Sequence, residues 1–178
     1  MPSARDLEKI WEQQARESRP LLDDLEPLGY SEQDWELGTA PSPAVAAMLI
    51  EHLDRPHPEH VHSWSARILG QLRTGEVWDA LARALDRTRP EQRSLQESLT
   101  SSLAQIATRE NLPLVRAYLA DKRIGESRMF FYGTLNRLRA PDRWEIIEAG
   151  LADPQLRKEA GYRLHQRELR EARKQRKK

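Results

Sequence analysis

A leucine recurs in this chain at intervals of 32, 34 and 32 residues, each time in a similar local sequence. The four copies are Leu53, Leu85, Leu119 and Leu151, and an aspartate follows each of them either directly or one residue later. Self-similarity with a fixed period of about 20 to 50 residues is typical of chains built from repeated supersecondary units. The recurrence therefore predicts a repeat protein and limits the architectures open to the rest of the chain.

A second series of leucines, in register with the first, defines what each repeat contains. Leu69, Leu103 and Leu135 each lie 16 residues before a leucine of the first series, and Leu164 begins a fourth unit. Three, nine and twelve residues further on, the chain is again apolar, at Leu72, Ile106 and Leu138, at Trp78, Leu112 and Trp144, and at Leu81, Val115 and Ile147. Counted from the first leucine of each unit, the residues at offsets 0 and 3 share one face of a helix. The residues at offsets 9, 12 and 16 share one face of the next helix. One hairpin cannot bury both faces, so neighbouring hairpins are expected to stack.

Local signals agree with an all-helical chain. No segment alternates apolar and polar residues as a half-buried strand does. Ser3, Ser42 and Thr74 are placed to cap helices, and Pro20 is placed to open a second short helix. Further helices are predicted over residues 90–107, 111–120, 126–138, 141–152 and 154–173, whereas residues 29–41 are predicted to form a loop with a helical turn.

Over residues 42–166 this pattern resembles HEAT repeats of the short bacterial kind, often called phycobilisome-lyase-like HEAT repeats. The resemblance implies an all-α fold, an α-solenoid of about four HEAT-like helical hairpins. Residues 1–41 match the repeats weakly and are predicted to form an N-terminal helical cap and loop. Residues 167–178 are predicted to form a basic tail that continues the last helix.

In that family an aspartate ends the first helix of each unit, and an arginine opens the second helix seven residues before its main leucine. Arg128 and Arg157 stand at this position in the last two units, whereas His62 and Gln96 take it in the other two. The resemblance therefore implies an Asp–Arg link between units only near the C-terminal end of the chain.

The second helices of the family line a concave groove, and this register gives the residues of this chain that are expected to face a partner. The candidate partner-binding residues are Trp64, Arg67, Gln71, Phe130, Arg137 and Tyr162, and Ser98 falls on the same stripe. Aromatic and arginine side chains dominate binding hot spots. The alternative is structural, with Trp64 packing on the N-terminal cap and Phe130 sharing the core with Phe131.

Charge is unevenly distributed along the chain. Residues 1–60 hold 5 Lys+Arg against 13 Asp+Glu, a net charge of −8, and residues 163–178 hold 8 against 2, a net charge of +6. The two ends can attract different partners, attract each other within one chain or head to tail, or form solvated helix faces. Basic tails bind phosphates without reading sequence, which makes nucleic acid the alternative partner. Its candidate contacts are Arg170, Arg173, Lys174, Arg176 and Lys177.

Few residues of this chain are placed for chemistry. His52, His57, His60 and His62 lie within eleven residues, but they form no His-Glu-x-x-His, and an exposed polar turn is the favoured interpretation. The sequence has no cysteine, no Gly-x-Ser-x-Gly and no glycine-rich phosphate loop. Some HEAT-like proteins are alkylpurine DNA glycosylases with Trp, Asp and Arg on the concave face, but here Glu159 is the only acidic residue on the predicted stripe. We predict no catalytic residue, no metal site and no cofactor.

The remaining expectations concern location and function. No apolar run approaches the roughly 20 residues that span a bilayer, and the charged N-terminus lacks the apolar stretch of a secretory signal. We expect a cytoplasmic protein without membrane contact and without enzyme activity. Its predicted function is that of a scaffold, as an adaptor, assembly factor or inhibitor, that binds another protein through the groove. The alternative is a nucleic-acid-binding HEAT-like protein, with a DNA glycosylase as its less favoured form.

Overall fold

The computed structural model describes residues 3–37 and 39–176, and this part of the chain is all-helical, with ten α-helices, three 3-10 segments and no strand. This confirms the predicted fold class at the level of an all-α protein. The chain forms two compact units, Met1–Ile106 and Ala107–Lys178, called unit 1 and unit 2 below. The boundary between them falls inside the range 42–166, and the domain limits expected at residues 41 and 166 stay predictions.

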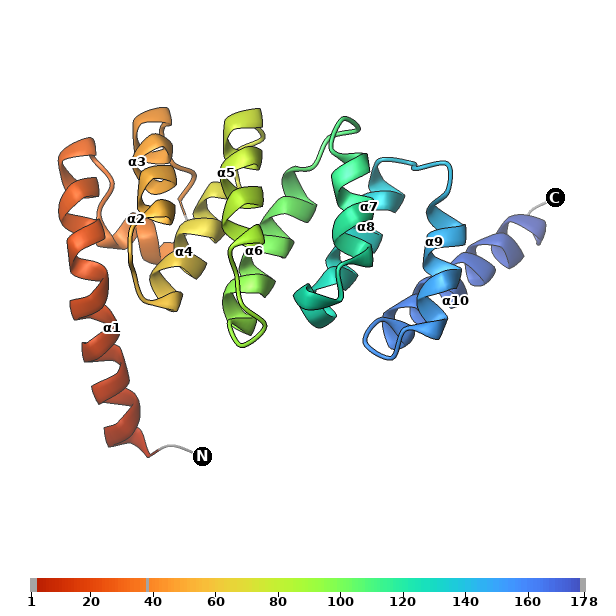
Figure 1. Cartoon of the computed structure of the whole chain (residues 1–178), viewed down its shortest axis with the longest axis horizontal. Helices are drawn as coiled ribbons and strands as arrows, with labels where there is room; N and C mark the ends of the chain where they lie inside the picture. The colour runs from red at the N-terminus through yellow and green to blue at the C-terminus, as the bar shows by residue number, and fades with distance from the viewer. Residues whose placement is uncertain (1–2, 38, 177–178) are drawn as a thin grey trace. The chain divides into compact units, whose positions relative to one another are not determined.

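Unit 1 contains six α-helices among its described residues. They are α1 (Ala4–Leu25), α2 (Glu32–Leu37), α3 (Pro43–Asp54), α4 (Glu59–Leu69), α5 (Gly75–Asp86) and α6 (Arg93–Ile106), with a 3-10 segment, η1 (Glu26–Leu28), after α1. Helix α3 packs on α4 and on α5, α6 packs on α4 and on α5, and α1 packs on α3 and α4 (Figure 1). Helices that hold equivalent places in successive hairpins are thus neighbours, as stacked hairpins require.

The leucine series forms the core of unit 1. Leu69, Leu85 and Leu103 have no exposed surface, and Leu53 is 5% exposed. The predicted caps are also present, since the Ser42 and Thr74 hydroxyls accept hydrogen bonds from the backbone N–H groups of Val45 and Val77. Each cap satisfies a donor that has no partner inside the helix.

Helix α1 is longer than the sequence predicts, because it continues through Pro20 instead of ending there. The prediction of a second helix opened by this proline was wrong. Pro20 is exposed, while Leu21 and Leu25 are fully buried, so the proline lies away from the packed face of the helix. Solvent can bond the carbonyl that the missing N–H leaves free, and the buried leucines hold the helix together across the proline.

The described residues of unit 2, which end at residue 176, contain four α-helices and two 3-10 segments. They are α7 (Leu112–Ala120), η2 (Lys122–Met129), α8 (Phe130–Arg137), α9 (Arg143–Ala149), η3 (Gly150–Ala152) and α10 (Arg157–Gln175). Helix α8 packs on α7 and α9, and α10 packs on α9 and η3. Leu135, Phe131 and Ile147 are fully buried in this unit. Leu151, which the repeat register places in the core, is 42% exposed, because η3 turns more tightly than an α-helix and carries this side chain off the packed face.

A buried arginine links two segments of unit 2, in the part of the chain where the family resemblance implies an Asp–Arg link. Arg128 is 1% exposed, and its Nη2 lies 3.0 Å from Oδ2 of Asp153. The guanidinium also donates to the carbonyl oxygens of Leu119 (3.1 Å) and Gly125 (2.8 Å). Arg157, the second arginine of the predicted pattern, is exposed and donates to the carbonyl of Leu151 instead of to an aspartate.

Candidate protein-binding cleft

The six residues predicted to face a partner are divided between the two units. In unit 1, Trp64 is half-buried on α4, and Arg67 and Gln71 are exposed at the end of that helix and just beyond it. Arg67 donates from Nε to the hydroxyl of Ser98, 3.3 Å away. Ser98 is 2% exposed, so its predicted place on an open groove stripe was wrong. Helix α6 packs against both α4 and α5, and little of its surface is left to form a groove.

The other three residues lie in unit 2. Phe130 is half-buried at the start of α8, and neighbouring Phe131 is fully buried. Arg137 is exposed and donates to the carbonyl oxygen of Ala107 at 3.0 Å. Tyr162 is 55% exposed on α10. Of the predicted aromatic residues, Tyr162 is thus the one most open to solvent.

Trp64 lines a cleft that the repeat register does not predict. The cleft has a volume of about 450 Å³. It lies between α1, α2 and α4, and is lined by Trp11, Gln14, Ala15, Ser18, Leu22, Glu32, His60 and Trp64. Trp11 is 67% exposed, so two tryptophans border the same opening, one open to solvent and one half-buried.

The apolar stripe of α1 continues from this cleft to the N-terminal end of the helix. At 100° per residue, Leu7, Trp11, Leu22 and Leu25 fall on one face. The C-terminal part of this stripe is buried, with Leu22 at 3% and Leu25 at 0% exposure. The N-terminal part is open, with Leu7 at 38%, Trp11 at 67% and the adjacent Ile10 at 44%. Figure 1 shows this part of α1 extending beyond α3 and α4. We call Leu7, Ile10 and Trp11 the open stripe.

Acidic side chains border the open stripe along both edges. By helical position, Asp6 and Glu17 follow one edge, and Glu8 and Glu12 follow the other. Hydrogen bonds from the side chain and backbone of Ser3 lower the pKa of Asp6, which keeps this carboxyl ionised at neutral pH. Glu32 of α2 adds a further carboxylate to the cleft lining. Lys9 and Arg16 lie on the opposite face of the helix, whereas Arg19, on the same side as Glu8 and Glu12, forms ion pairs with Asp23 and Glu26.

The histidines tie α1 to α3 and α4, which corrects their interpretation as an exposed turn. His52 is 1% exposed, with Nε2 3.0 Å from Asp24 Oδ2 and Nδ1 2.8 Å from Nε2 of His57. His60 Nε2 lies 3.4 Å from the hydroxyl of Ser18. Burial, more than any neighbouring charge, lowers the pKa of His52. Among the described residues, no three His, Asp or Glu side chains are arranged to hold a metal ion.

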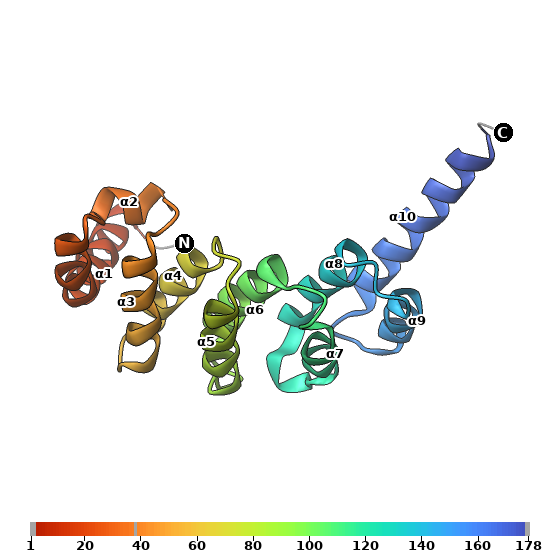
Figure 2. The same cartoon turned by 90° about the horizontal axis from the view of Figure 1, so that it is seen from above.

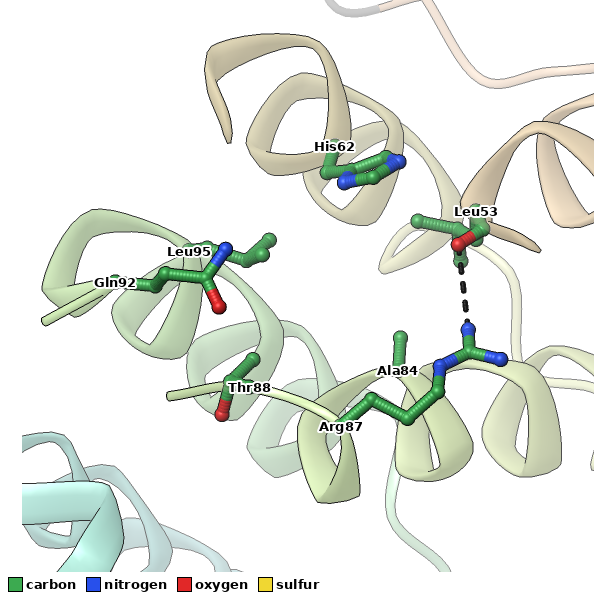
Figure 3. Close-up of a pocket in the computed structure, with 7 residues that line it drawn as sticks. All are labelled: Leu53, His62, Ala84, Arg87, Thr88, Gln92 and Leu95. Atoms are coloured by element: carbon green, nitrogen blue, oxygen red, sulfur yellow. Dashed lines mark hydrogen bonds between the residues drawn. The ribbon is translucent and has the colours of Figure 1, made fainter. Parts of the chain in front are cut away.

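A smaller cavity, of about 130 Å³, lies where α3, α4, α5 and α6 meet (Figure 3). Arg87 on its wall donates to the carbonyl oxygen of Leu53 at 3.2 Å and forms an ion pair with Asp54 at 2.6 Å. Gln96 donates to the hydroxyl of Thr88, 3.2 Å away. These polar groups join successive helices to one another, so we assign the cavity to the architecture of unit 1.

Unit 2 has an apolar cavity of about 370 Å³ between α7, α9 and η3. Arg116 and Asp142 form a two-bonded ion pair on its wall, with N–O distances of 2.7 and 2.8 Å. Asp153, also on the wall, is held by Arg128. The polar groups of this wall are therefore engaged in holding unit 2 together.

Comparison with known proteins leaves function to be argued from this geometry. No protein-family model matches the chain, and no curated protein or solved structure matches it significantly. No helix in the described part of the chain is long and apolar enough to cross a membrane.

Sequence reasoning assigned Trp64 to the site but missed Trp11. The available signal was the apolar spacing of Leu7, Ile10 and Trp11 in a segment that matches the repeats only weakly. The cleft itself could not be derived from the sequence, because it depends on how far α1 extends past α4.

Proposed function

We propose that this chain is a non-catalytic protein-binding module, and that the open stripe and the adjoining cleft receive an amphipathic helix of its partner. One observation carries the proposal: the stripe that is buried where α1 meets α3 and α4 continues, uncovered, past the cleft. Contiguous exposed apolar surface marks interaction sites on soluble proteins. Trp11 and Trp64 supply the residue type most enriched at binding hot spots.

The charges around the stripe define the chemistry of the partner. An apolar stripe with Asp6 and Glu17 along one edge and Glu8 and Glu12 along the other favours a helix whose apolar face lies between lysines or arginines. Helix-in-groove recognition uses apolar anchors at positions i, i+3, i+4 and i+7, which an amphipathic helix provides. The proposed partner segment is therefore a basic amphipathic helix.

The fold proposal accompanies this function. We propose that the helical hairpins are HEAT-like repeats and that the protein works as a scaffold of that class. The packing of α3 on α5 and of α4 on α6 supports this, as does the Arg128–Asp153 link. Trp64, Arg67 and Gln71 belong to the proposed binding surface of unit 1, and Phe130, Arg137 and Tyr162 stay proposed contacts of unit 2.

The test uses the full-length protein and a labelled model peptide of about five helical turns, with leucines at helical spacing between lysines. We expect saturable binding by fluorescence anisotropy. Trp11→Ala should weaken binding about 30-fold, which is the loss of a 2 kcal/mol hot spot. Because Trp11 is 67% exposed, the circular dichroism spectrum should not change. Trp144→Ala, a tryptophan of unit 2, is the matched control and should bind as the unmodified protein does.

A second peptide distinguishes charge-specific recognition from nonspecific apolar binding. It keeps the leucines and replaces every lysine with glutamate, so it presents like charges to the acidic edges of the stripe. The proposal fails if this peptide binds as well as the basic one, or if Trp11→Ala binds the basic peptide normally.

Nucleic acid is the second candidate, on one specific observation. Arg170, Arg173, Lys174 and Arg176 are all exposed on the described part of α10 and just after it. Lys177, the fifth predicted contact, lies outside the described residues. Glu159, the acidic residue a glycosylase groove would use, is bound to Arg163 at 2.6 Å, so we do not propose that activity.

The salt dependence of DNA binding decides this alternative. If the basic residues contact phosphates, affinity for duplex DNA falls with log salt by about 0.9 per phosphate neutralised, and truncation after Gln166 abolishes it. We expect only weak DNA binding at about 150 mM salt. Tight binding that depends on the tail would favour the nucleic-acid function over the protein-binding one.

A further inference from the structure

The C-terminal half of α10 is a second exposed helix surface. In Figure 2 this part of the helix extends away from α8 and α9. At 100° per residue, Tyr162, Leu169, Arg173 and Arg176 fall along one stripe. Tyr162 is 55% and Leu169 is 40% exposed, and both arginines are exposed as well. This stripe of four residues, called the tail stripe below, combines apolar anchors with positive charge.

Charged residues of both signs surround the tail stripe on α10. Arg170 lies at one edge of the tail stripe and Glu168 lies at the other, whereas Glu171, Arg167 and Lys174 lie toward the opposite side of the helix. Glu171 also accepts a hydrogen bond from Nε of Arg167, at 3.0 Å. The tail stripe itself carries two arginines and no carboxylate, and Arg170 adds a third positive charge at one edge.

The tail stripe has the chemistry that the open stripe of α1 requires. One is apolar with carboxylates along both edges, and the other is apolar with arginines along and beside it. The two ends of the chain carry net charges of opposite sign, −8 over residues 1–60 and +6 over residues 163–178. Complementary charge of this kind speeds encounter and selects the partner, while apolar anchors hold the contact.

We propose that the partner is a second copy of this chain, with the tail stripe of one copy seated on the open stripe and cleft of the next. This inference rests on the proposed function, because it names the occupant of the same cleft. The contact joins two different surfaces, so every copy has one surface of each kind. Such heterologous contacts produce closed rings, of which a reciprocal dimer is the smallest, or open chains.

Sedimentation velocity of the full-length protein over about a hundredfold concentration range tests this inference. We expect assembled species, dimers or larger, whose fraction rises with concentration and which dissociate at high salt. Two charge-reversed variants should each weaken association at least tenfold. The first carries Glu8→Lys and Glu12→Lys on α1, and the second carries Arg170→Glu and Arg173→Glu on α10.

Mixing the two variants gives the sharpest result. The basic tail of the first variant complements the acidic α1 of the second variant. The acidic tail of the second variant complements the basic α1 of the first variant. Association should therefore return in the mixture although neither variant associates alone. Lys9→Glu with Arg16→Glu, on the opposite face of α1, is the matched control and should associate normally.

The outcomes separate this inference from the proposed function. If the unmodified protein stays monomeric while the basic model peptide binds, the cleft serves another partner, and self-assembly is refuted while the proposed function stands. If the protein is monomeric and truncation after Gln166 strengthens peptide binding, the tail covers its own cleft, and the second copy is again refuted. Association that persists in either reversed variant also refutes the contact. If the protein stays monomeric and the peptide does not bind, both proposals fail.

Discussion

Replacement of Arg128 by methionine should destabilise unit 2 strongly, because this arginine is buried and has several acceptors. The side chain is 1% exposed and binds the Asp153 carboxylate, the Gln155 side chain and two backbone carbonyls. Methionine fills most of the volume but donates nothing. Each buried acceptor left without a donor costs about 1–3 kcal/mol, offset in part because a buried charge no longer has to be desolvated. We expect a net loss of about 3 kcal/mol in the free energy of unfolding.

Arg116→Met is the matched control in the same unit. Arg116 forms an ion pair of better geometry, with two bonds of 2.7 and 2.8 Å to Asp142, but the two side chains are 35% and 33% exposed. Exposed pairs contribute only about 0–1 kcal/mol, since water solvates both partners when the pair is broken. The comparison therefore isolates the effect of burial on the free energy of unfolding. If the lengths of the ion-pair bonds decided the loss, Arg116→Met would be the more destabilised variant.

The pH dependence of the same pair supplies an independent check. Burial raises the pKa of Asp153, but hydrogen bonds from the Gln155 backbone and from Arg128 outweigh it, and the net pKa is lowered. The stabilisation is therefore present above the unfolded-state pKa of about 3.9 and is lost as pH falls toward the folded-state pKa. Arg128→Met should reduce this acid sensitivity.

Urea unfolding followed by hydrogen-exchange mass spectrometry measures both variants and reports unit 2 separately from unit 1. Separate readout matters because two units need not unfold in one step. If Arg128→Met and Arg116→Met lose stability to within 1 kcal/mol of each other, the account of Arg128 as a buried link is wrong.

Three further predictions concern the core and the histidine cluster. Leu103→Ala should cost about 2–5 kcal/mol by chemical denaturation, and a loss well below 1 kcal/mol would mean that the repeat register does not describe the core. Gly150→Ala places a Cβ against Oη of Tyr132, so it should lower the free energy of unfolding by about 1–3 kcal/mol. Adding Tyr132→Phe to the same chain should recover part of that loss, and no recovery would contradict the close approach. Burial lowers the pKa of His52, so below about pH 6.5 the unfolded chain binds a proton that the folded chain does not. The free energy of unfolding should therefore decrease as the pH is lowered through this range. If His52→Asn shows the same dependence of unfolding free energy on pH, this account of His52 is wrong.

The sequence by itself determined the helical class and most of the core. Leu69, Leu103 and Leu135 are fully buried as the repeat register predicts, because helical spacing of apolar residues is a local property that fixes which face is apolar. The caps at Ser42 and Thr74 follow from the same local chemistry. The family resemblance implied an Asp–Arg link near the C-terminal end without naming the pair, and the structure joins Arg128 to Asp153.

Tertiary structure decided which apolar faces are covered. The stripe of α1 reads the same along its length, yet Leu25 is fully buried and Trp11 is 67% exposed, because α3 and α4 reach only one end of the helix. Ser98 and His52 are polar residues that the sequence suggested were open, and packing against neighbouring helices buries both. Spacing shows which side of a helix is apolar, but the extent of the neighbouring helices determines whether that side becomes core or a binding surface.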